Sequence, residues 1–211
     1  MRRLVISGVS KSFGGLRAVD GVSFSIDAGE LVGLIGPNGS GKTTLLSSLA
    51  GREPPGGGTV VRDGKPIQPR RPACIAQGGL LRMFQLTRVF RRVSTLDNLL
   101  TAGRALGLTH RQAAARAEQL LAELTLERVS DLAAGELSGG QQKLLEFGCC
   151  FMVPPRIALL DEPFAAVHPA MKEIMAGYIR ERYAEGQTFL IVSHDMPVIV
   201  ELCPRTVCMN A

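Results

Sequence analysis

A glycine-rich loop between an apolar segment and a helix constrains the fold of this chain more than any other feature. Residues 36–43 read Gly-Pro-Asn-Gly-Ser-Gly-Lys-Thr and match the phosphate-loop pattern G-x-x-x-x-G-K-[ST] in full. Residues 31–35 form a compact apolar run before the loop, and 43–50 continue as a predicted helix. Glycines let backbone N–H groups point at phosphate oxygens, and a helix start favours the same negative charge. The loop therefore predicts a nucleotide site at a strand-to-helix junction.

Two residue types at the end of the loop suit this chemistry. Lys42 would place a cation on the outer phosphates, and the Thr43 hydroxyl is a ligand type that Mg²⁺ accepts. The alternative is a glycine-rich turn that happens to precede a lysine. The strand before the loop and the helix after it favour the phosphate-binding interpretation.

A pair of carboxylates, Asp161 and Glu162, ends a second apolar run at 157–160. A parallel sheet would align this strand end beside the phosphate loop. Asp161 would then hold Mg²⁺ through water, and Glu162 would polarise an attacking water. The alternative is an ordinary strand end with a capping acid. Next to a phosphate loop, the pair extends the prediction from nucleotide binding to hydrolysis.

Strand and helix patterns alternate along the 211 residues, which suit one domain or a core with a small inserted subdomain. Apolar patterning predicts strands at 4–9, 22–26, 31–35, 59–62, 157–160 and 189–192, and helices within 43–50, 96–126, 141–152 and 170–184. Thr109 is a predicted N-cap inside the long helical stretch. This alternation favours an α/β fold whose sheet is mostly parallel and covered by helices.

Composition excludes several classes of protein. Charges, prolines or glycines interrupt every apolar stretch before the ~20 residues of a membrane span, and the start of the chain lacks a signal peptide's apolar core, so we expect a cytosolic protein. The five cysteines show no paired spacing and are expected to be reduced thiols. The net charge of +5 comes without a long basic run, and aromatics make up only 5%, so nucleic acid is not an expected partner.

The order of these parts resembles the ATP-binding cassette (ABC) family, the ATPase subunits of ABC transporters. Residues 137–141 read Leu-Ser-Gly-Gly-Gln, which is the signature of that family. Gln85 falls at its Q-loop glutamine and His194 at its switch histidine, while Phe13 falls where the family stacks an aromatic on adenine. Taken singly, a Phe is more often a core residue and a His more often a structural one. Their roles therefore rest on the shared register, which covers nearly the whole chain.

This resemblance implies an ATPase that uses ATP and Mg²⁺. The implied fold is an α/β P-loop NTPase core with an N-terminal antiparallel β region and an inserted α-helical subdomain. The whole chain, 1–211, would be a single ABC ATPase domain, with 1–84 and 154–211 as the core and 85–153 as the helical part. The implied ATP-binding residues are Phe13, Gly36, Pro37, Asn38, Gly39, Ser40, Gly41, Lys42, Thr43 and Thr44. The implied catalytic residues are Glu162, His194 and Gln85, and those for Mg²⁺ are Thr43, Gln85 and Asp161.

The resemblance also implies a second cassette subunit, alike or different, that faces this one head to tail. Each ATP would lie between one phosphate loop and the signature residues of the other chain, which here are Leu137, Ser138, Gly139, Gly140 and Gln141. The residues themselves make this credible, because Ser138 and two glycine amides at a helix start form a second anion-binding nest.

A narrower resemblance is to the subfamily that serves branched-chain amino acid uptake. It is carried by Arg-Met-Phe-Gln at 82–85, Arg-Val-Phe at 88–90, Thr-Leu-Asp-Asn-Leu at 95–99 and the text LSGGQQKLLE at 137–146. Transmembrane permease subunits and, indirectly, a solute-binding protein are the implied partners. The implied location is the cytoplasmic face of the inner membrane, and 85–100 would line a groove for a permease helix.

Two departures from the family pattern keep other interpretations open. His168 stands in the D-loop, where the family has Asn or Asp, and this predicts slower or pH-dependent hydrolysis. The sequence also ends soon after 206–209, where relatives continue, so we expect a shortened or divergent relative. The alternatives are a soluble, non-transport ABC ATPase and a catalytically weakened regulatory cassette.

Overall fold

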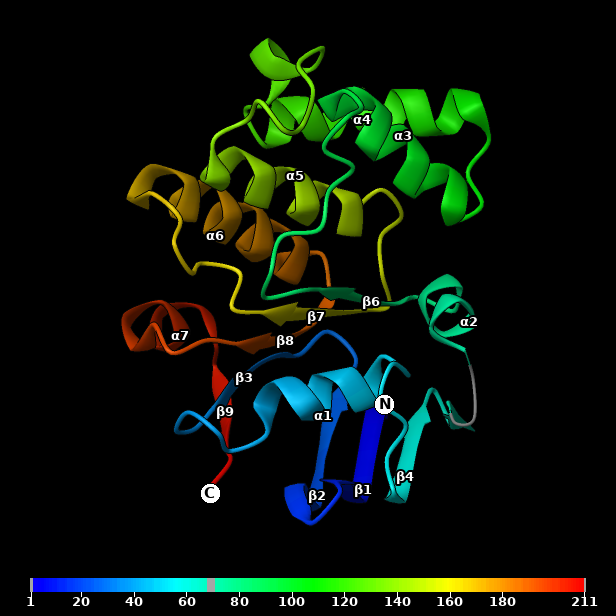
Figure 1. Ribbon diagram of the computed structural model, residues 1–211, viewed down its shortest axis with the longest axis vertical. Helices are drawn as coiled ribbons and strands as arrows, with labels where there is room; N and C mark the ends of the chain where they lie inside the picture. The colour runs from blue at the N-terminus through cyan, green and yellow to red at the C-terminus, as the bar shows by residue number, and fades with distance from the viewer. Residues whose placement is uncertain (1, 68–70, 211) are drawn as a thin grey trace.

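The computed structural model describes residues 2–67 and 71–210, which form two β-sheets with helices around them (Figure 1). The first sheet is antiparallel, with the order β2-β1-β4-β5. Its strands are β1 (Arg2–Phe13), β2 (Leu16–Asp27), β4 (Gly57–Arg62) and β5 (Lys65–Pro66). The strands expected at 4–9 and 22–26 lie within the longer β1 and β2. Gly8 and Gly21 adopt positive φ angles and the register shifts near Gly8, so the strands continue through a bulge that interrupts their sequence pattern.

The second sheet is parallel, in the order β6-β7-β8-β3-β9. It consists of β3 (Leu31–Ile35), β6 (Leu80–Met83), β7 (Ile157–Asp161), β8 (Thr188–Val192) and β9 (Arg205–Cys208). Every residue of β7 and β8 is buried, as expected of central strands that are covered on both faces. This arrangement confirms the predicted parallel, covered sheet.

Two hydrophobic cores cover the two faces of this sheet. On one face, Leu45, Leu46 and Leu49 of α1 (Lys42–Leu49) pack with Val32 and Leu34 of β3 and with the first sheet. On the other face, α5 (Gly139–Cys150) and α6 (Pro169–Ala184) pack on the alternate side chains of β7 and β8. Figure 1 shows α1 below the sheet and α5 and α6 above it. The helix that follows the phosphate loop and the signature helix therefore lie on opposite faces of one sheet.

The helical stretch expected at 96–126 is divided into α3 (Thr95–Ala105), α4 (His110–Glu123) and the 3-10 turn η1 (Glu127–Val129). Gly107 adopts φ 97°, which breaks the helix, and Thr109 then forms a capping box with Gln112. The predicted N-cap at Thr109 is confirmed. The division of the chain at 85 and 153 stays a prediction.

Two short helices, α2 (Pro72–Gln77) and α7 (Met196–Leu202), and the strands β6 and β9 were not predicted from the sequence. Each is too short to show a periodic pattern.

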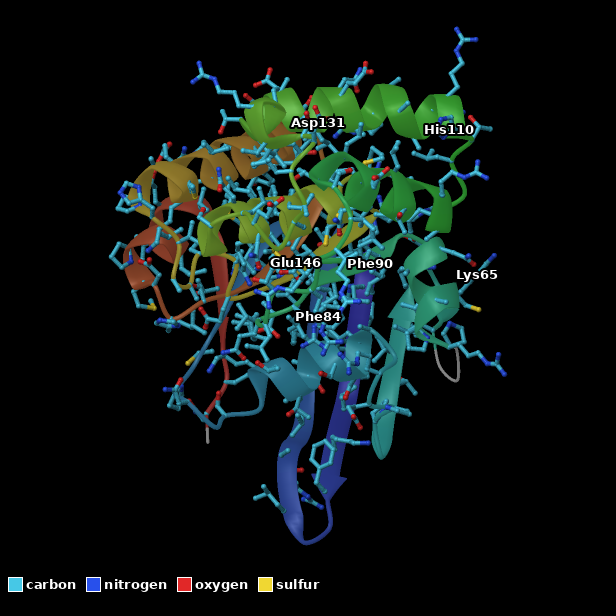
Figure 2. The ribbon with its side chains drawn as sticks, turned by 45° about the horizontal axis from the view of Figure 1, so that its top comes forward. Lys65, Phe84, Phe90, His110, Asp131 and Glu146 are labelled. Carbon is cyan, nitrogen blue, oxygen red and sulfur yellow. The ribbon has the colours of Figure 1, made fainter. Side chains whose placement is uncertain are left out.

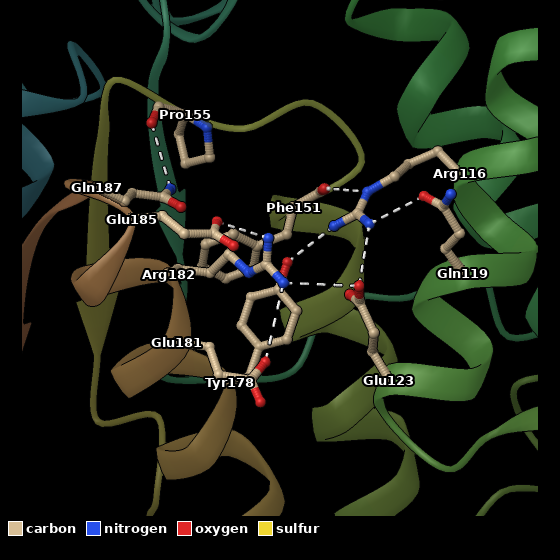
Figure 3. A network of polar contacts seen from close by, with 10 residues as sticks. All are labelled: Arg116, Gln119, Glu123, Phe151, Pro155, Tyr178, Glu181, Arg182, Glu185 and Gln187. Carbon is tan, nitrogen blue, oxygen red and sulfur yellow. Dashed lines mark hydrogen bonds and ion pairs between the residues drawn. The ribbon is translucent and has the colours of Figure 1, made fainter.

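A polar network holds α4, α5 and α6 together above the parallel sheet (Figure 3). Arg116 of α4 donates to the carbonyl of Phe151 at the end of α5 and to the hydroxyl of Tyr178 on α6. Arg182 of α6 lies 3.7 Å from Glu123 of α4 and stacks over the Tyr178 ring. Burial raises the pKa of Tyr178 to about 12, so the hydroxyl stays neutral and accepts this hydrogen bond.

Candidate nucleotide site

The phosphate loop joins β3 to α1 and is held tightly against its surroundings. A Cβ atom at Gly41, which has φ 87°, would lie 2.1 Å from the carbonyl oxygen of Ala18. At Gly36 a Cβ atom would lie 2.3 Å from the carbonyl oxygen of Met209. Only glycine fits such close backbone approaches. Gly41 is also the N-cap of α1, so the helix begins immediately after the loop.

Lys42 and Thr43 occupy the first turn of α1. The Lys42 ammonium donates to the carbonyls of Gly36 and Pro37, at 2.8 Å each, which ties its charge to the loop. The Thr43 hydroxyl lies 3.3 Å from Oδ1 of Asp161, the last residue of β7. The fold thus brings the carboxylate of Asp161, 118 positions away from Thr43 in the sequence, to the helix start that carries Lys42 and Thr43.

Asp161 is fully buried at the end of β7, and its second oxygen is paired with a residue that sequence reasoning missed. Arg82, in β6, donates from Nη2 to Oδ2 of Asp161 at 2.8 Å and from Nη1 to the Ser47 hydroxyl at 2.7 Å. Burial lowers the pKa of Arg82, while the hydrogen bond to Asp161 opposes this shift. Arg82 belongs to the subfamily stretch at 82–85, but its partner is distant in sequence.

The residues at this point fit Mg²⁺. The ion takes oxygen ligands and is commonly held by one or two protein oxygens together with waters and substrate phosphates. Oδ1 of Asp161 and the Thr43 hydroxyl supply such oxygens close together. Within 2–67 and 71–210 there is no cluster of three or more His, Cys, Asp or Glu that could hold a metal ion, so a site here depends on the hydroxyl and the phosphates.

Glu162 and His194 contact each other beside the loop. Glu162 is 8% exposed and has φ 51°, a conformation that is uncommon for a non-glycine residue. Its Oε2 atom lies 2.9 Å from Nδ1 of His194 and 3.3 Å from the backbone nitrogen of the same residue. The Glu162 N–H donates to the carbonyl of Val192. A nearly buried carboxylate is therefore oriented by an exposed histidine from the end of the neighbouring strand β8.

An open cavity of about 470 Å³ joins most of the predicted ATP-binding residues. Such a volume suits a nucleotide-sized ligand. The residues from the predicted set that line it are Phe13, Asn38, Gly39, Gly41, Lys42, Thr43, Thr44, Gln85 and Glu162. The sequence did not point to Leu16, Arg17 and Ala18, which line the cavity from the β1–β2 hairpin and the start of β2. The exposure of Leu16, 70%, is visible only in the fold.

The signature residues lie elsewhere. None of residues 137–141 is among the described residues that line this cavity. Ser138 is the N-cap of α5, and its hydroxyl and the Gln141 side chain form a capping box. Leu137 is buried, whereas Ser138 and Gly139 are exposed, and a Cβ atom at Gly139 would meet nothing within 4 Å. The open face of this loop is available to another molecule.

The structure also describes the cysteines and the lengths of the apolar helices. All five cysteines are free thiols. In the part of the chain that the structure describes, no helix is long and apolar enough to span a bilayer.

Comparison with known proteins identifies the family of this chain. The family described as ABC transporter matches residues 19–165. The high-affinity branched-chain amino acid transport ATP-binding protein BraF of Pseudomonas aeruginosa is 34% identical, over 98% of this chain and 88% of that protein. The Nod factor export ATP-binding protein I of Burkholderia lata is 36% identical, over 93% of this chain but 64% of that protein. An ATP-binding cassette of an ABC transporter, solved in its ADP conformation, has a TM-score of 0.85 at 32% identity and covers 99% of this chain and 87% of that one.

The phosphate loop, the carboxylates beside it and these likenesses lead to one assignment. The chain belongs to the ABC transporter family, as an ATP-binding and ATP-hydrolysing subunit.

Proposed function

We propose that this subunit energises the import of branched-chain amino acids or similar solutes, at the cytoplasmic face of the membrane. BraF is named for high-affinity branched-chain amino acid transport and aligns over 88% of its length, whereas the Nod factor export subunit aligns over 64% of its own. The observation that carries the ATPase part is the convergence of Lys42, Thr43 and Glu162 on one cavity.

Substrate binding would use the two walls of this cavity. The loop amides and Lys42 face the phosphates, which favour a helix N-terminus and a cation. Phe13 is 46% exposed and lines the same cavity, so its ring can stack on the adenine base. Thr43 and Asp161 would hold Mg²⁺, with Gln85 reaching it from the cavity edge. When bound, the ion neutralises charge on the outer phosphate oxygens.

Hydrolysis would depend on Glu162 and His194. Oε1 of Glu162 can accept a hydrogen bond from the attacking water, while Oε2 is already engaged by His194. This contact fixes the carboxylate's orientation, and orientation is a main source of catalysis in phosphoryl transfer. The His194 side chain is 71% exposed, so its other nitrogen can reach the outer phosphate.

A second cassette would complete the site. The exposed loop at Ser138 and Gly139 offers a hydroxyl and amide donors, but the text of 137–142 contains no cation. Its Ser138 hydroxyl lies 3.0 Å from Oε1 of Gln141 and would have to rotate to reach a phosphate. The partner would be a second copy of this chain or a similar cassette.

Permease subunits would bind near Gln85. Leu86, Phe90 and Val93 follow it along the chain and are 77%, 62% and 39% exposed. Large apolar side chains that are exposed within one short segment are candidates for a protein-binding surface. Gln85 lies next to this surface and also lines the nucleotide cavity, so it can relay movement between them. A solute-binding protein would act on the permease only.

The test is a leucine uptake assay in the host organism. Cells that lack this chain should lose uptake of labelled leucine, and the wild-type chain should restore it. Glu162→Gln should not restore uptake, although the purified variant should still bind ATP, because the substitution removes only the group that polarises water. Turnover should fall by at least about 100-fold, the size of effect expected for a catalytic base. Normal turnover by Glu162→Gln would refute the catalytic assignment, and unchanged uptake in cells lacking the chain would refute the solute.

A further inference from the structure

Two buried charged side chains of α5, Lys143 and Glu146, contact the backbone that carries Gln85. Lys143 and Glu146 are each 4% exposed. The Lys143 ammonium donates to the carbonyls of Phe84 and Gln85, at 3.0 Å each. Oε1 of Glu146 accepts from the Phe84 N–H at 3.3 Å, and Oε2 lies 3.7 Å from the Lys143 ammonium. Figure 2 shows Glu146 and Phe84 in the middle of the molecule, between the helices and the first sheet.

Burying such charges is unfavourable unless their hydrogen bonds are made. Burial lowers the pKa of Lys143, although the charges of Glu146 and Asp161 oppose this shift. Burial also raises the pKa of Glu146, and the charge of Lys143 opposes it. An apolar pair of similar volume would avoid this cost but would leave the backbone of Phe84 and Gln85 unheld. The pair's distinctive contribution is therefore to hold that backbone.

We infer that Lys143 and Glu146 are positioning residues that fix Gln85 to the signature helix. This inference rests on the role proposed for Gln85 above. Three hydrogen bonds hold the backbone of two successive residues, so the backbone from which the Gln85 side chain projects is fixed to α5. Gln85 lines the nucleotide cavity, while Ser138, five positions before Lys143, begins the same helix.

The consequence is a rigid link between the signature residue Ser138 and Gln85 in the nucleotide cavity. Ser138 and Lys143 are separated by about 7.5 Å along the helix axis. A nucleotide from a second cassette that engages Ser138 would displace α5, and the displacement would reach Gln85 through Lys143. The link passes through a helix and three hydrogen bonds, which form one contiguous physical path.

The experiment measures steady-state ATP turnover of the assembled transporter carrying Lys143→Met, which keeps the stem and removes the ammonium. We expect kcat to fall about tenfold or more while KM for ATP stays within about twofold, because a small displacement of a positioned group impairs chemistry more than binding. Lys143→Arg restores a buried cation with several donors and should recover most of kcat. Gln85→Ala should slow the wild type, yet add little to the loss in Lys143→Met, since the two act through one group.

Arg116→Met is a matched control. Arg116, on α4, is also a cation that donates to a backbone carbonyl, but its acceptor is Phe151 at the C-terminal end of α5 and not Phe84 or Gln85. This substitution should lower the melting temperature and leave kcat unchanged. If Lys143→Met folds poorly because Glu146 is left unpaired, the double variant Lys143→Met, Glu146→Leu removes both charges and should fold, with the same loss of kcat.

Three results would overturn the inference. Lys143→Met and the double variant could both keep full kcat while Gln85→Ala slows turnover, which would leave the role of Gln85 intact and refute the link. The loss in Lys143→Met and the loss in Gln85→Ala could add in full, which would mean that they act independently. Gln85→Ala could leave turnover unchanged, which would refute the proposed role of Gln85 and the link with it.

Discussion

The two glycine-rich loops of this molecule each begin a helix, yet they are built differently. The phosphate loop is capped by Gly41 in a left-handed conformation without a side-chain cap, and Lys42 supplies a cation. The signature loop is capped by Ser138 through a capping box, and no cation lies within 137–142. The first has Asp161 and Glu162 beside it, whereas the second has an open face.

This difference separates a loop that binds the nucleotide from a half-site that a second cassette would supply. A loop with its own cation and carboxylates can bind a nucleotide and position water by itself. A loop that offers only amides and one hydroxyl can add donors to a phosphate that another chain already holds. Substitutions in the first loop should therefore affect binding, and those in the second should affect turnover in the assembly.

Among the substitutions that affect ATP affinity or the second loop, the largest effect is expected for Lys42→Ala. Loss of the Lys42 ammonium removes a charge-assisted hydrogen bond to the ATP phosphates, worth ~2–3 kcal/mol. The ATP affinity of the isolated chain should therefore fall by about 30- to 150-fold. Fluorescence titration with a labelled ATP analogue measures this. Lys65→Ala, which removes a lysine from β5 outside the nucleotide cavity, is the matched control and should bind as the wild type does. Equal ATP affinities for the two variants would show that Lys42 does not bind the ATP phosphates.

A smaller change, in the rate of ATP turnover, is expected for a substitution of His168, which lies at the start of the helix beside the signature loop. His168 caps α6, whose Met171 lies against Gly140 of the signature. His168→Asn keeps a good cap and restores the residue type that the family has there. ATP turnover of the assembled transporter should rise about two- to fivefold, which corresponds to ~0.5–1 kcal/mol of the barrier. His110→Asn, on the first residue of α4, should leave the rate unchanged, and an unchanged rate for His168→Asn would remove any special role for it.

The smallest effect concerns the ion pair between Glu30 and Arg205, which lies at the starts of β3 and β9. Burial alone would raise the pKa of Glu30, but hydrogen bonds from Arg205 and from the Asp27 N–H outweigh it, and the pKa lies below its usual 4.5. A lowered pKa means that this pair stabilises the fold above about pH 4.5 and that the contribution is lost as the pH falls.

Arg205→Met should therefore destabilise the chain by no more than ~1 kcal/mol at pH 7, because the pair is partly exposed, and by less near pH 3. Urea unfolding at the two pH values measures the difference. A destabilisation that is equal at both would contradict the ion-pair account.

Sequence patterns predicted the parts of the site that are local and missed those that depend on long-range contacts. The phosphate loop and the Asp161–Glu162 strand end are each read from a few adjacent residues. The contact between Glu162 and His194 joins residues 32 positions apart, and that between Lys143 and Gln85 joins residues 58 positions apart. Only the parallel sheet and the helix packed on it bring these together.

Arg82 shows the same limit. It lies in a stretch that the sequence marked as typical of the subfamily, but its partner Asp161 is 79 positions away. Strand lengths were underestimated at Gly8, because a bulge interrupts alternation without ending the strand. Short elements such as α2 carry too few residues for any period to show.

The central claim, that the signature loop is a half-site, is tested most directly by Ser138→Arg. ATP affinity should be measured on the isolated chain and turnover on the assembled transporter, from the same preparation. We predict an ATP dissociation constant within about twofold of the wild type, together with turnover at least about tenfold slower, because the bulky side chain blocks only the face that meets the second cassette. An affinity weakened as much as in Lys42→Ala, or unimpaired turnover, would contradict the account.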